Sequence, residues 1–447
     1  MNLTQVSKET SMKRNVIRCA SVLSLAAMPL LLAGCGGFSA DSGPRLVNVS
    51  GVNGQAIGGR QPISGASIYM YAASSSGYAG SATNVLTTPV TTTATGTFYI
   101  SSFTCTAGQQ MYIVSMGGDP GAGTNANAGI MAALGDCANL GQYSFININE
   151  ITTVAAAFAL APFSSGYGTV GTSSTNTAGL SRAFASAGKL ANVVTGFSVG
   201  TALPAGAVGP TSEVNSLANV LAACVNTTGG VSGDGSVCGK LFGYATPSGG
   251  SAPTDTIGAV MQIAQNPTLN VASIFNLAST VPPYSGGLLT APNDWTMSIN
   301  YAPSGLSSPK STTIDANGNV WIANSGNNTV TVLKQTGATM TGSPFSSNGL
   351  SSPAAIAIDA SGNAWVANKG GTSVSAFTSS GGVFSGSPFT GSGNLSAPSS
   401  LAFDAGGDLW VANSTGNSVA ELSSAGSFVT QITTGVTAPN AIVINPK

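Results

Sequence analysis

The chain has 447 residues, of which 43% are hydrophobic but only 6% are charged. Soluble domains carry roughly 25% charged residues, so the surface of this protein must consist mainly of Ser, Thr, Asn and Gly. The length predicts about two to four domains. There is no His, which excludes a Ser-His or Cys-His triad, a His metal site and a His general base.

The charge distribution excludes nucleic acid as a partner. Residues 1–34 contain four of the 13 basic residues and one of the 14 acidic ones. Residues 35–447 therefore carry nine basic and 13 acidic residues, a net charge of −4. Nucleic-acid binding needs clustered Lys and Arg. These nine cations lie far apart in the sequence.

The N-terminus predicts a signal peptide over residues 1–34. Lys13, Arg14 and Arg18 precede the apolar run 19–32, which is too short to span a bilayer as a stable helix. The run ends in Leu32-Ala33-Gly34-Cys35, which resembles the bacterial lipobox. The resemblance implies a lipoprotein that is acylated (palmitoylated) at Cys35, with residues 35–46 as a polar tether.

This anchor predicts where the protein acts. An acylated Cys35 makes the lipid bilayer a partner, because several acyl chains hold a protein on a membrane better than one. Gly36 after the Cys resembles outer-membrane sorting in lipoproteins. We therefore expect a cell-envelope protein on the periplasmic or surface face of the outer membrane.

Four further cysteines indicate disulfide bonds in an oxidising compartment. Four cysteines allow three connectivities, and their spacing favours local pairing in two successive domains. No Cys-x-x-Cys motif occurs, so we assign no metal site to them. The expected disulfide residues are Cys105, Cys137, Cys224 and Cys238.

Residues 47–148 predict a β-sandwich. Apolar residues alternate in Ile63–Tyr71 and Thr97–Ile100 between Gly turns, which is typical of strands. The order Pro-Ile-Ser-Gly-Ala-x-Ile-x-Met-Tyr followed by Thr-Gly-x-Phe-x-Ile resembles the carboxypeptidase regulatory-like β-sandwich. Its motif residues build the core, so we carry over no binding residue.

Residues 149–285 predict a small α-helical region of five short helices, because an Ala-rich texture with helical apolar spacing begins at Asn149. We expect Glu150 to stabilise the dipole of the first helix. Arg182 and Lys189, seven residues apart, are expected on a solvated face. The predicted helices are 150–160, 183–194, 213–225 behind a Ser212 cap, 256–264 and 271–277.

Residues 286–447 contain an internal repeat. Pro309, Pro353, Pro398 and Pro439 lie 44, 45 and 41 residues apart, and each of the first three units continues into an Asp, a Gly turn and a segment such as Val320-Trp321-Ile322-Ala323-Asn324. A period in the forties with four short strands per unit predicts a propeller blade.

The phrase Pro-x4-Ile-Asp-x2-Gly-Asn-x-Trp-Val-Ala-Asn resembles NHL-type repeats and streptogramin-lyase-like (Vgb-like) propellers. Those enzymes rely on His, so their activity is disfavoured here. Propellers close with about four to eight blades, whereas three full repeats and the strand 441–445 are visible. Residues 295–301 look like an outer strand that would join strand 441–445 in a composite fourth blade, although two inner strands would still be missing. An open arc, assembly with another copy and degenerate blades are equally open alternatives.

Two residue types recur in the repeats. Asp315, Asp359 and Asp404 each precede a Gly by three positions, where a carboxylate bonds a turn or ligates calcium; we interpret them as turn residues. Three asparagines end the second strand of each repeat and are candidate binding residues at a shared rim: Asn324, Asn368 and Asn413. We assign no catalytic residue, metal or cofactor.

The sequence thus predicts a mainly β multidomain protein with an N-terminal β-sandwich, a central α-helical region and a C-terminal propeller. We expect a non-enzymatic lipoprotein that binds a protein, peptide or glycan through its propeller loops. One alternative is a propeller lyase or hydrolase that uses a metal and acids such as Asp408. The other is a structural component of an envelope assembly, including a homo-oligomer.

Overall fold

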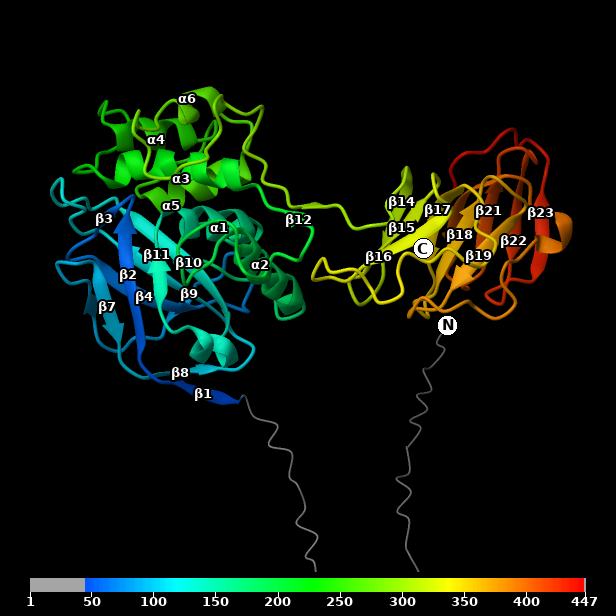
Figure 1. Ribbon diagram of the computed structural model, residues 1–447, viewed down its shortest axis with the longest axis horizontal. Helices are drawn as coiled ribbons and strands as arrows, with labels where there is room; N and C mark the ends of the chain where they lie inside the picture. The colour runs from blue at the N-terminus through cyan, green and yellow to red at the C-terminus, as the bar shows by residue number, and fades with distance from the viewer. Residues whose placement is uncertain (1–44, 446–447) are drawn as a thin grey trace, which may run out of the picture. The chain divides into compact units, whose positions relative to one another are not determined.

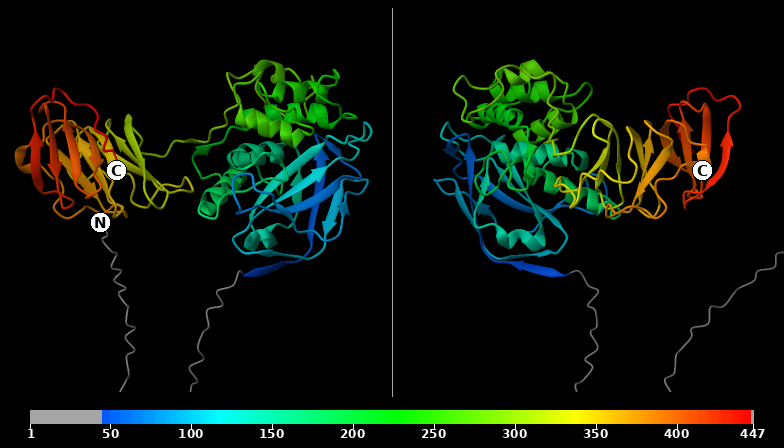
Figure 2. Two further views of the ribbon diagram at one scale, coloured as in Figure 1. Left: turned by 180° about the vertical axis from the view of Figure 1, so that it is seen from behind. Right: turned by 45° about the vertical axis from the view of Figure 1, so that its right-hand side comes forward.

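A computed structural model describes residues 45–445. It contains N-terminal strands, a central group of helices and C-terminal sheets that resemble propeller blades (Figures 1 and 2). The predicted mainly β multidomain fold with a central helical region is therefore confirmed. The predicted signal peptide and the lipidated Cys35 lie outside the described residues.

The N-terminal strands form two main sheets and one short pair. In the five-stranded sheet β10, β9, β4 and β5 follow one another and β6 joins β4; in the second, β11, β2 and β3 follow one another and β7 joins β2. The pair consists of β1 and β8. The strands are β1 (Leu46–Val49), β2 (Val52–Gly58), β3 (Gln61–Pro62), β4 (Ser67–Ala72), β5 (Thr83–Asn84), β6 (Val90–Thr91), β7 (Thr97–Ile100), β8 (Phe103–Thr106), β9 (Gln110–Met116), β10 (Gly129–Asp136) and β11 (Ile146–Ile148).

The five-stranded sheet is covered on both faces. Successive side chains of a strand point to opposite faces. Met70 of β4 packs into the core that the two sheets share, whereas its neighbour Tyr71 packs into the core formed with the helices. Tyr71 stacks on Tyr112 of β9 with ring centroids 5.3 Å apart. The sheet therefore joins two hydrophobic cores.

Six helices follow the strands, where five were predicted. They are α1 (Glu150–Leu160), α2 (Thr177–Leu190), α3 (Thr211–Val225), α4 (Val237–Ala245), α5 (Thr256–Gln265) and α6 (Val271–Phe275). Helix α4 escaped prediction because Gly239 and Gly243 weaken the helical pattern. Ser236 caps it, since its Oγ accepts from the Gly239 N–H at 2.9 Å.

Two helix boundaries were predicted incorrectly. Helix α2 was expected over 183–194 but begins at Thr177 and ends at Leu190, because Ala191 is extended. Ser212 was expected as the cap of α3 but lies inside its first turn, and the capping residue Pro210 makes no side-chain bond. Both errors concern ends, where local signals are weakest.

The composite fourth blade predicted from residues 295–301 does not form. Trp295 is fully buried in the core with the helices, 6.5 Å from the ring of Phe275. The short strand β13 (Asn300–Tyr301) pairs with β12 (Ala207–Val208) and not with a blade. The sequence prediction for this segment was wrong because a buried Trp followed by alternating residues is as typical of a blade strand as of a segment packed on helices.

The C-terminal region contains three antiparallel blades. The first two have three strands each, and single bridges such as Val330–Phe345 and Val374–Phe389 replace the fourth. The third has four strands. They are β14 (Pro309–Ile314), β15 (Val320–Asn324), β16 (Thr329–Leu333), β17 (Pro353–Ile358), β18 (Ala364–Asn368), β19 (Ser373–Phe377), β20 (Pro398–Phe403), β21 (Leu409–Asn413), β22 (Ser418–Leu422) and β23 (Phe428–Ile432).

Residues 438–445 occupy the position of another inner strand. The Ile442 N–H donates to Ser400 Oγ at 3.2 Å, as the Ile356 N–H donates to Ser311 Oγ at 3.3 Å between the first two blades. The expected strand 441–445 is not hydrogen-bonded into a sheet. Residues 438–445 nevertheless lie beside the third blade as the first strand of a further blade would.

Candidate functional site

The recurring aspartates serve the turns of their own blades, as interpreted from the sequence. Asp359 Oδ1 accepts from the Ser361 N–H at 2.9 Å and the Asn363 N–H at 2.8 Å. Its Oδ2 accepts from Trp365 Nε1 at 3.0 Å. Asp315 with Trp321 and Asp404 with Trp410 repeat this arrangement. Each carboxylate therefore bonds both a hairpin turn and a Trp of its blade, and the Trp is fully buried in the first two blades.

At Asp315 and Asp404 these hydrogen bonds favour the ionised carboxylate. Burial raises the pKa of Asp315, but the hydrogen bonds from Trp321 and Asn319 outweigh it, so the pKa lies below its usual range. The Trp410 indole, followed by the Asp408 N–H, lowers the pKa of Asp404. Asp315 and Asp404 are thus stabilised as charged acceptors, which suits a structural role.

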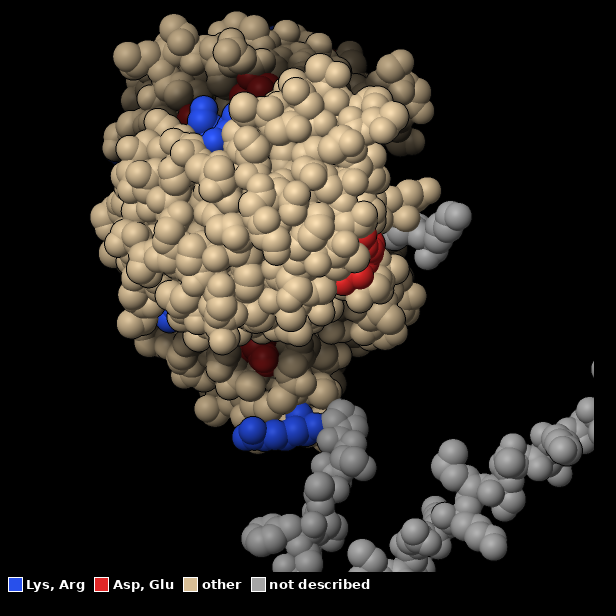
Figure 3. Space-filling model, turned by 90° about the vertical axis from the view of Figure 1, so that its right-hand side faces the viewer, with Lys and Arg blue, Asp and Glu red and all other residues tan. Residues whose placement is uncertain are grey.

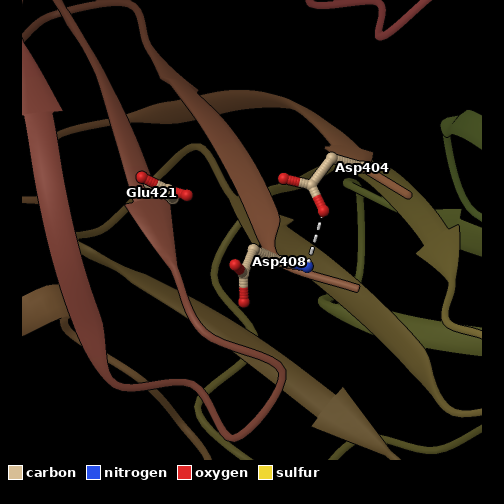
Figure 4. A group of neighbouring side chains, drawn as sticks. All are labelled: Asp404, Asp408 and Glu421. Carbon is tan, nitrogen blue, oxygen red and sulfur yellow. Dashed lines mark hydrogen bonds between the residues drawn. The ribbon is translucent and has the colours of Figure 1, made fainter. Parts of the chain in front are cut away.

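The third blade departs from the other two at this turn. Asp408 stands where Asn319 and Asn363 donate a side-chain N–H to the turn Asp in the first two blades. Glu421, opposite Trp410, takes the place of an apolar residue in β16 and β19. One oxygen each of Asp404, Asp408 and Glu421 lie within 4.8 Å of one another (Figure 4). Within residues 45–445 this is the one such group of three acids.

The candidate rim asparagines lie inside the blades. Asn368 is fully buried; its Nδ2 donates to Ser373 Oγ at 3.0 Å and Ser375 Oγ at 2.8 Å, and its Oδ1 accepts from the Ser351 N–H. Asn324 and Asn413 are also fully buried and make related bonds. Their amides link strands within a blade and are not presented on an exposed rim.

Both expected local disulfides form. Cys105 of β8 is bonded to Cys137 next to β10, 32 residues later. Cys224 of α3 is bonded to Cys238 of α4, 14 residues later. All four cysteines are buried. The second bond joins α3 to the helix that sequence reasoning missed, so the Cys spacing was its one sequence signal.

Glu150 has a larger role than the expected interaction with the helix dipole. Its carboxylate is fully buried, and both oxygens accept from the Gly59 N–H at 2.9 Å. Tyr284 Oη donates to Oε2 at 2.5 Å. Burial raises the pKa of Glu150 to about 7, although these hydrogen bonds lower it. Three distant segments therefore converge on one buried acid.

Charged side chains are sparse on the face shown in Figure 3. This agrees with the composition of 6% charged residues. Among the helices of residues 45–445, none combines the length and the hydropathy that a membrane span requires.

Comparisons with known proteins give limited similarity. No family model and no curated protein match the chain. Virginiamycin B lyase from Staphylococcus aureus is 17% identical with a TM-score of 0.26 and covers 30% of this chain and 43% of its own. A streptogramin B lyase is 18% identical with a TM-score of 0.28, and the match covers 32% of this chain and 46% of the lyase. A functionally unknown protein from Desulfotomaculum acetoxidans is 18% identical with a TM-score of 0.28, and the match covers 33% of this chain and 49% of that protein. The chain spans less than half the length of each.

Proposed function

We propose that this protein is a lipid-anchored binding module of the bacterial cell envelope. The observation that carries the proposal is the internal use of the polar repeat residues. Asp359 and Asn368, with their equivalents, bond within their own blades, so the blades act as a scaffold. Binding then falls to the loops between strands, where recognition residues commonly lie on rigid scaffolds.

The anchor of this proposal rests on the sequence. Leu32-Ala33-Gly34-Cys35 follows a basic segment and a short apolar run, the order of a lipoprotein signal. Acylation at Cys35 would hold the protein at the outer membrane on its periplasmic or surface face. The partner there is a protein, peptide or glycan, because a surface of hydroxyls and amides recognises polar, uncharged groups.

A second candidate function is metal-assisted lyase or hydrolase chemistry. The group of Asp404, Asp408 and Glu421 favours it, since carboxylates are the preferred ligands of hard cations. Asp404 is already engaged by Trp410, and so we rank this function below binding. Turnover of a substrate by the purified protein, lost in Glu421→Gln, would reverse the ranking.

The anchor is tested in cells by Cys35→Ser. We expect wild-type protein to incorporate a palmitate analogue and to sediment with the outer membrane, and the variant to lose both. Cys19→Ser, within the signal region, is the matched control and should retain both. Sedimentation and labelling of the Cys35→Ser variant would refute the lipoprotein assignment.

The binding role is tested with the full chain purified in detergent. We expect saturable binding to one class of envelope peptide or glycan and, by light scattering, a single copy of the chain per micelle. A defined oligomer without ligand binding would instead support the structural-component alternative.

A further inference from the structure

A cavity of about 360 Å³ gathers three cations of this charge-poor chain. Arg182 and Lys189 reach it from α2, and Lys334 follows β16. They are three of the eight Lys and Arg residues among the described residues. No Asp or Glu lines the cavity. The sequence predicted a solvated face for Arg182 and Lys189; Arg182 is exposed and Lys189 is half-buried, and both line this one open cavity.

A tyrosine orients one of these cations. Lys189 Nζ donates to Tyr301 Oη at 3.1 Å and lies 5.7 Å from the centroid of the Tyr301 ring. Both contacts leave the ammonium charge uncompensated, since a phenol and a ring face carry no net charge. The cavity therefore presents unneutralised positive charge, and an anion is the complementary ligand.

One wall of the cavity is formed by an aromatic ring that packs on a glycine, a contact that also occurs between neighbouring blades. A Cβ added at Gly381 would lie 1.9 Å from Phe345, and one at Gly426 would lie 2.3 Å from Phe389, because the aromatic ring of one blade fills the space above the glycine of the next. Tyr301 packs on Gly337 of the first blade in the same way, at 2.1 Å. The segment that carries Tyr301 therefore packs on the first blade as one blade packs on the next, although it is not itself a blade. It forms one wall of the cavity.

The rest of the lining is largely apolar. It includes Ala185, Ala202, Val320, Leu333 and Ile314, which is 66% exposed. Ligand sites combine such apolar walls with a few convergent polar groups. A ligand with a charged head and a short apolar body satisfies both parts of the lining.

We propose that this cavity binds a small amphiphilic anion, whose carboxylate or phosphate group contacts Arg182, Lys189 and Lys334. Guanidinium and ammonium groups form short, charge-assisted hydrogen bonds to such oxygens. The inference goes beyond the proposed function, because it concerns a small-molecule site outside the propeller loops and needs no lipid anchor. Failure of either therefore leaves the other standing.

Calorimetry on the full chain in detergent tests the proposal with probes too short to enter micelles appreciably. Butyl phosphate and butyrate distinguish the two head groups, inorganic phosphate lacks the apolar part, and butanol lacks the charge. We expect saturable binding of butyl phosphate or butyrate, weaker binding of inorganic phosphate and none of butanol. Binding should weaken when NaCl is raised from about 0.05 to about 0.5 M. No saturable binding of either charged probe would overturn the proposal.

Substitutions locate the site. Arg182→Gln and Lys334→Gln should each weaken binding about tenfold or more, since each removes a charge-assisted bond. Lys369→Gln, which changes a lysine of the second blade outside the cavity, is the matched control and should bind like wild type. Circular dichroism confirms that the variants fold. Equal affinity of wild type and both cavity variants, or equal loss in Lys369→Gln, would contradict the assignment.

Discussion

Trp365 Nε1 donates a 3.0 Å hydrogen bond to Asp359 Oδ2, and this bond joins the core of the second blade to its first hairpin turn. The indole is fully buried, so its N–H needs a partner inside the protein. Asp359 supplies it while its other oxygen holds the turn. One side chain thus couples turn geometry to blade packing, and the same pair recurs in each blade.

Replacing this acceptor should destabilise the second blade. Asp359→Ala removes the turn bonds and leaves the buried Trp365 N–H unpaired, and we expect a loss of about 3 kcal/mol. Ser361→Ala, in the same turn, keeps the main-chain N–H that bonds Asp359 and should change stability by less than about 0.5 kcal/mol. Urea unfolding followed by Trp fluorescence measures both. Equal midpoints for the two variants would show that the Asp–Trp pair adds no stability.

The third blade should become more stable in Asp408→Asn. The amide restores the side-chain donor that Asn363 supplies to Asp359 in the second blade at 2.9 Å, and it removes a negative charge beside Asp404 and Glu421. Thermal unfolding should shift upward. The reciprocal change Asn363→Asp should lower stability by about 1 kcal/mol. A lower melting temperature for Asp408→Asn would indicate that the three acids stabilise the blade together, as they would around a cation.

Stability should fall as the pH rises through the range set by Glu150. Burial raises its pKa from an ordinary value of 4.5 to about 7 in the folded protein, so the folded state binds the proton more tightly than the unfolded state. This stabilisation is fully present below pH 4.5 and is lost as the pH approaches 7, by on the order of 3 kcal/mol.

Glu150→Gln is the matched variant for this effect, because it keeps the shape of the side chain and cannot ionise. Its unfolding free energy, measured in urea between pH 4.5 and 7.5, should lack the component of the decline that Glu150 causes in wild type. Asp234→Asn, which alters an exposed acid, should leave the decline unchanged. Identical pH profiles for wild type and Glu150→Gln would disprove the linkage.

Loss of either disulfide should lower stability. Cross-links that close loops of 32 and 14 residues each contribute about 3 to 4 kcal/mol in the chain-entropy model. We expect Cys105→Ala/Cys137→Ala and Cys224→Ala/Cys238→Ala to unfold at lower urea concentrations than wild type. Mass spectrometry after thiol labelling without reduction should find no free thiol among these four residues in wild type. Free thiols there, with unchanged unfolding midpoints in both double variants, would contradict the pairing.

Features that depend on local repetition were predictable from the amino-acid sequence alone. The period of about 44 residues predicted the blades, because each repeat is one unit of strands and turns. The spacing from Asp359 to its Gly predicted a turn carboxylate, and the separate Cys pairs predicted local disulfides. The same local signals failed at α4 and at Trp295, where glycines obscured a helix and a buried Trp imitated a blade strand.

Features that depend on contacts between distant segments were not predictable in this way and became visible in the fold. Asn368 was predicted as a rim residue, but it is buried among serines. Glu150 bonds Gly59 and Tyr284, which lie 91 and 134 residues away in the sequence. The cavity that unites Arg182 with Lys334 has no sequence signature either. Periodicity records which face of an element is apolar, whereas the partner of that face is fixed by packing in three dimensions.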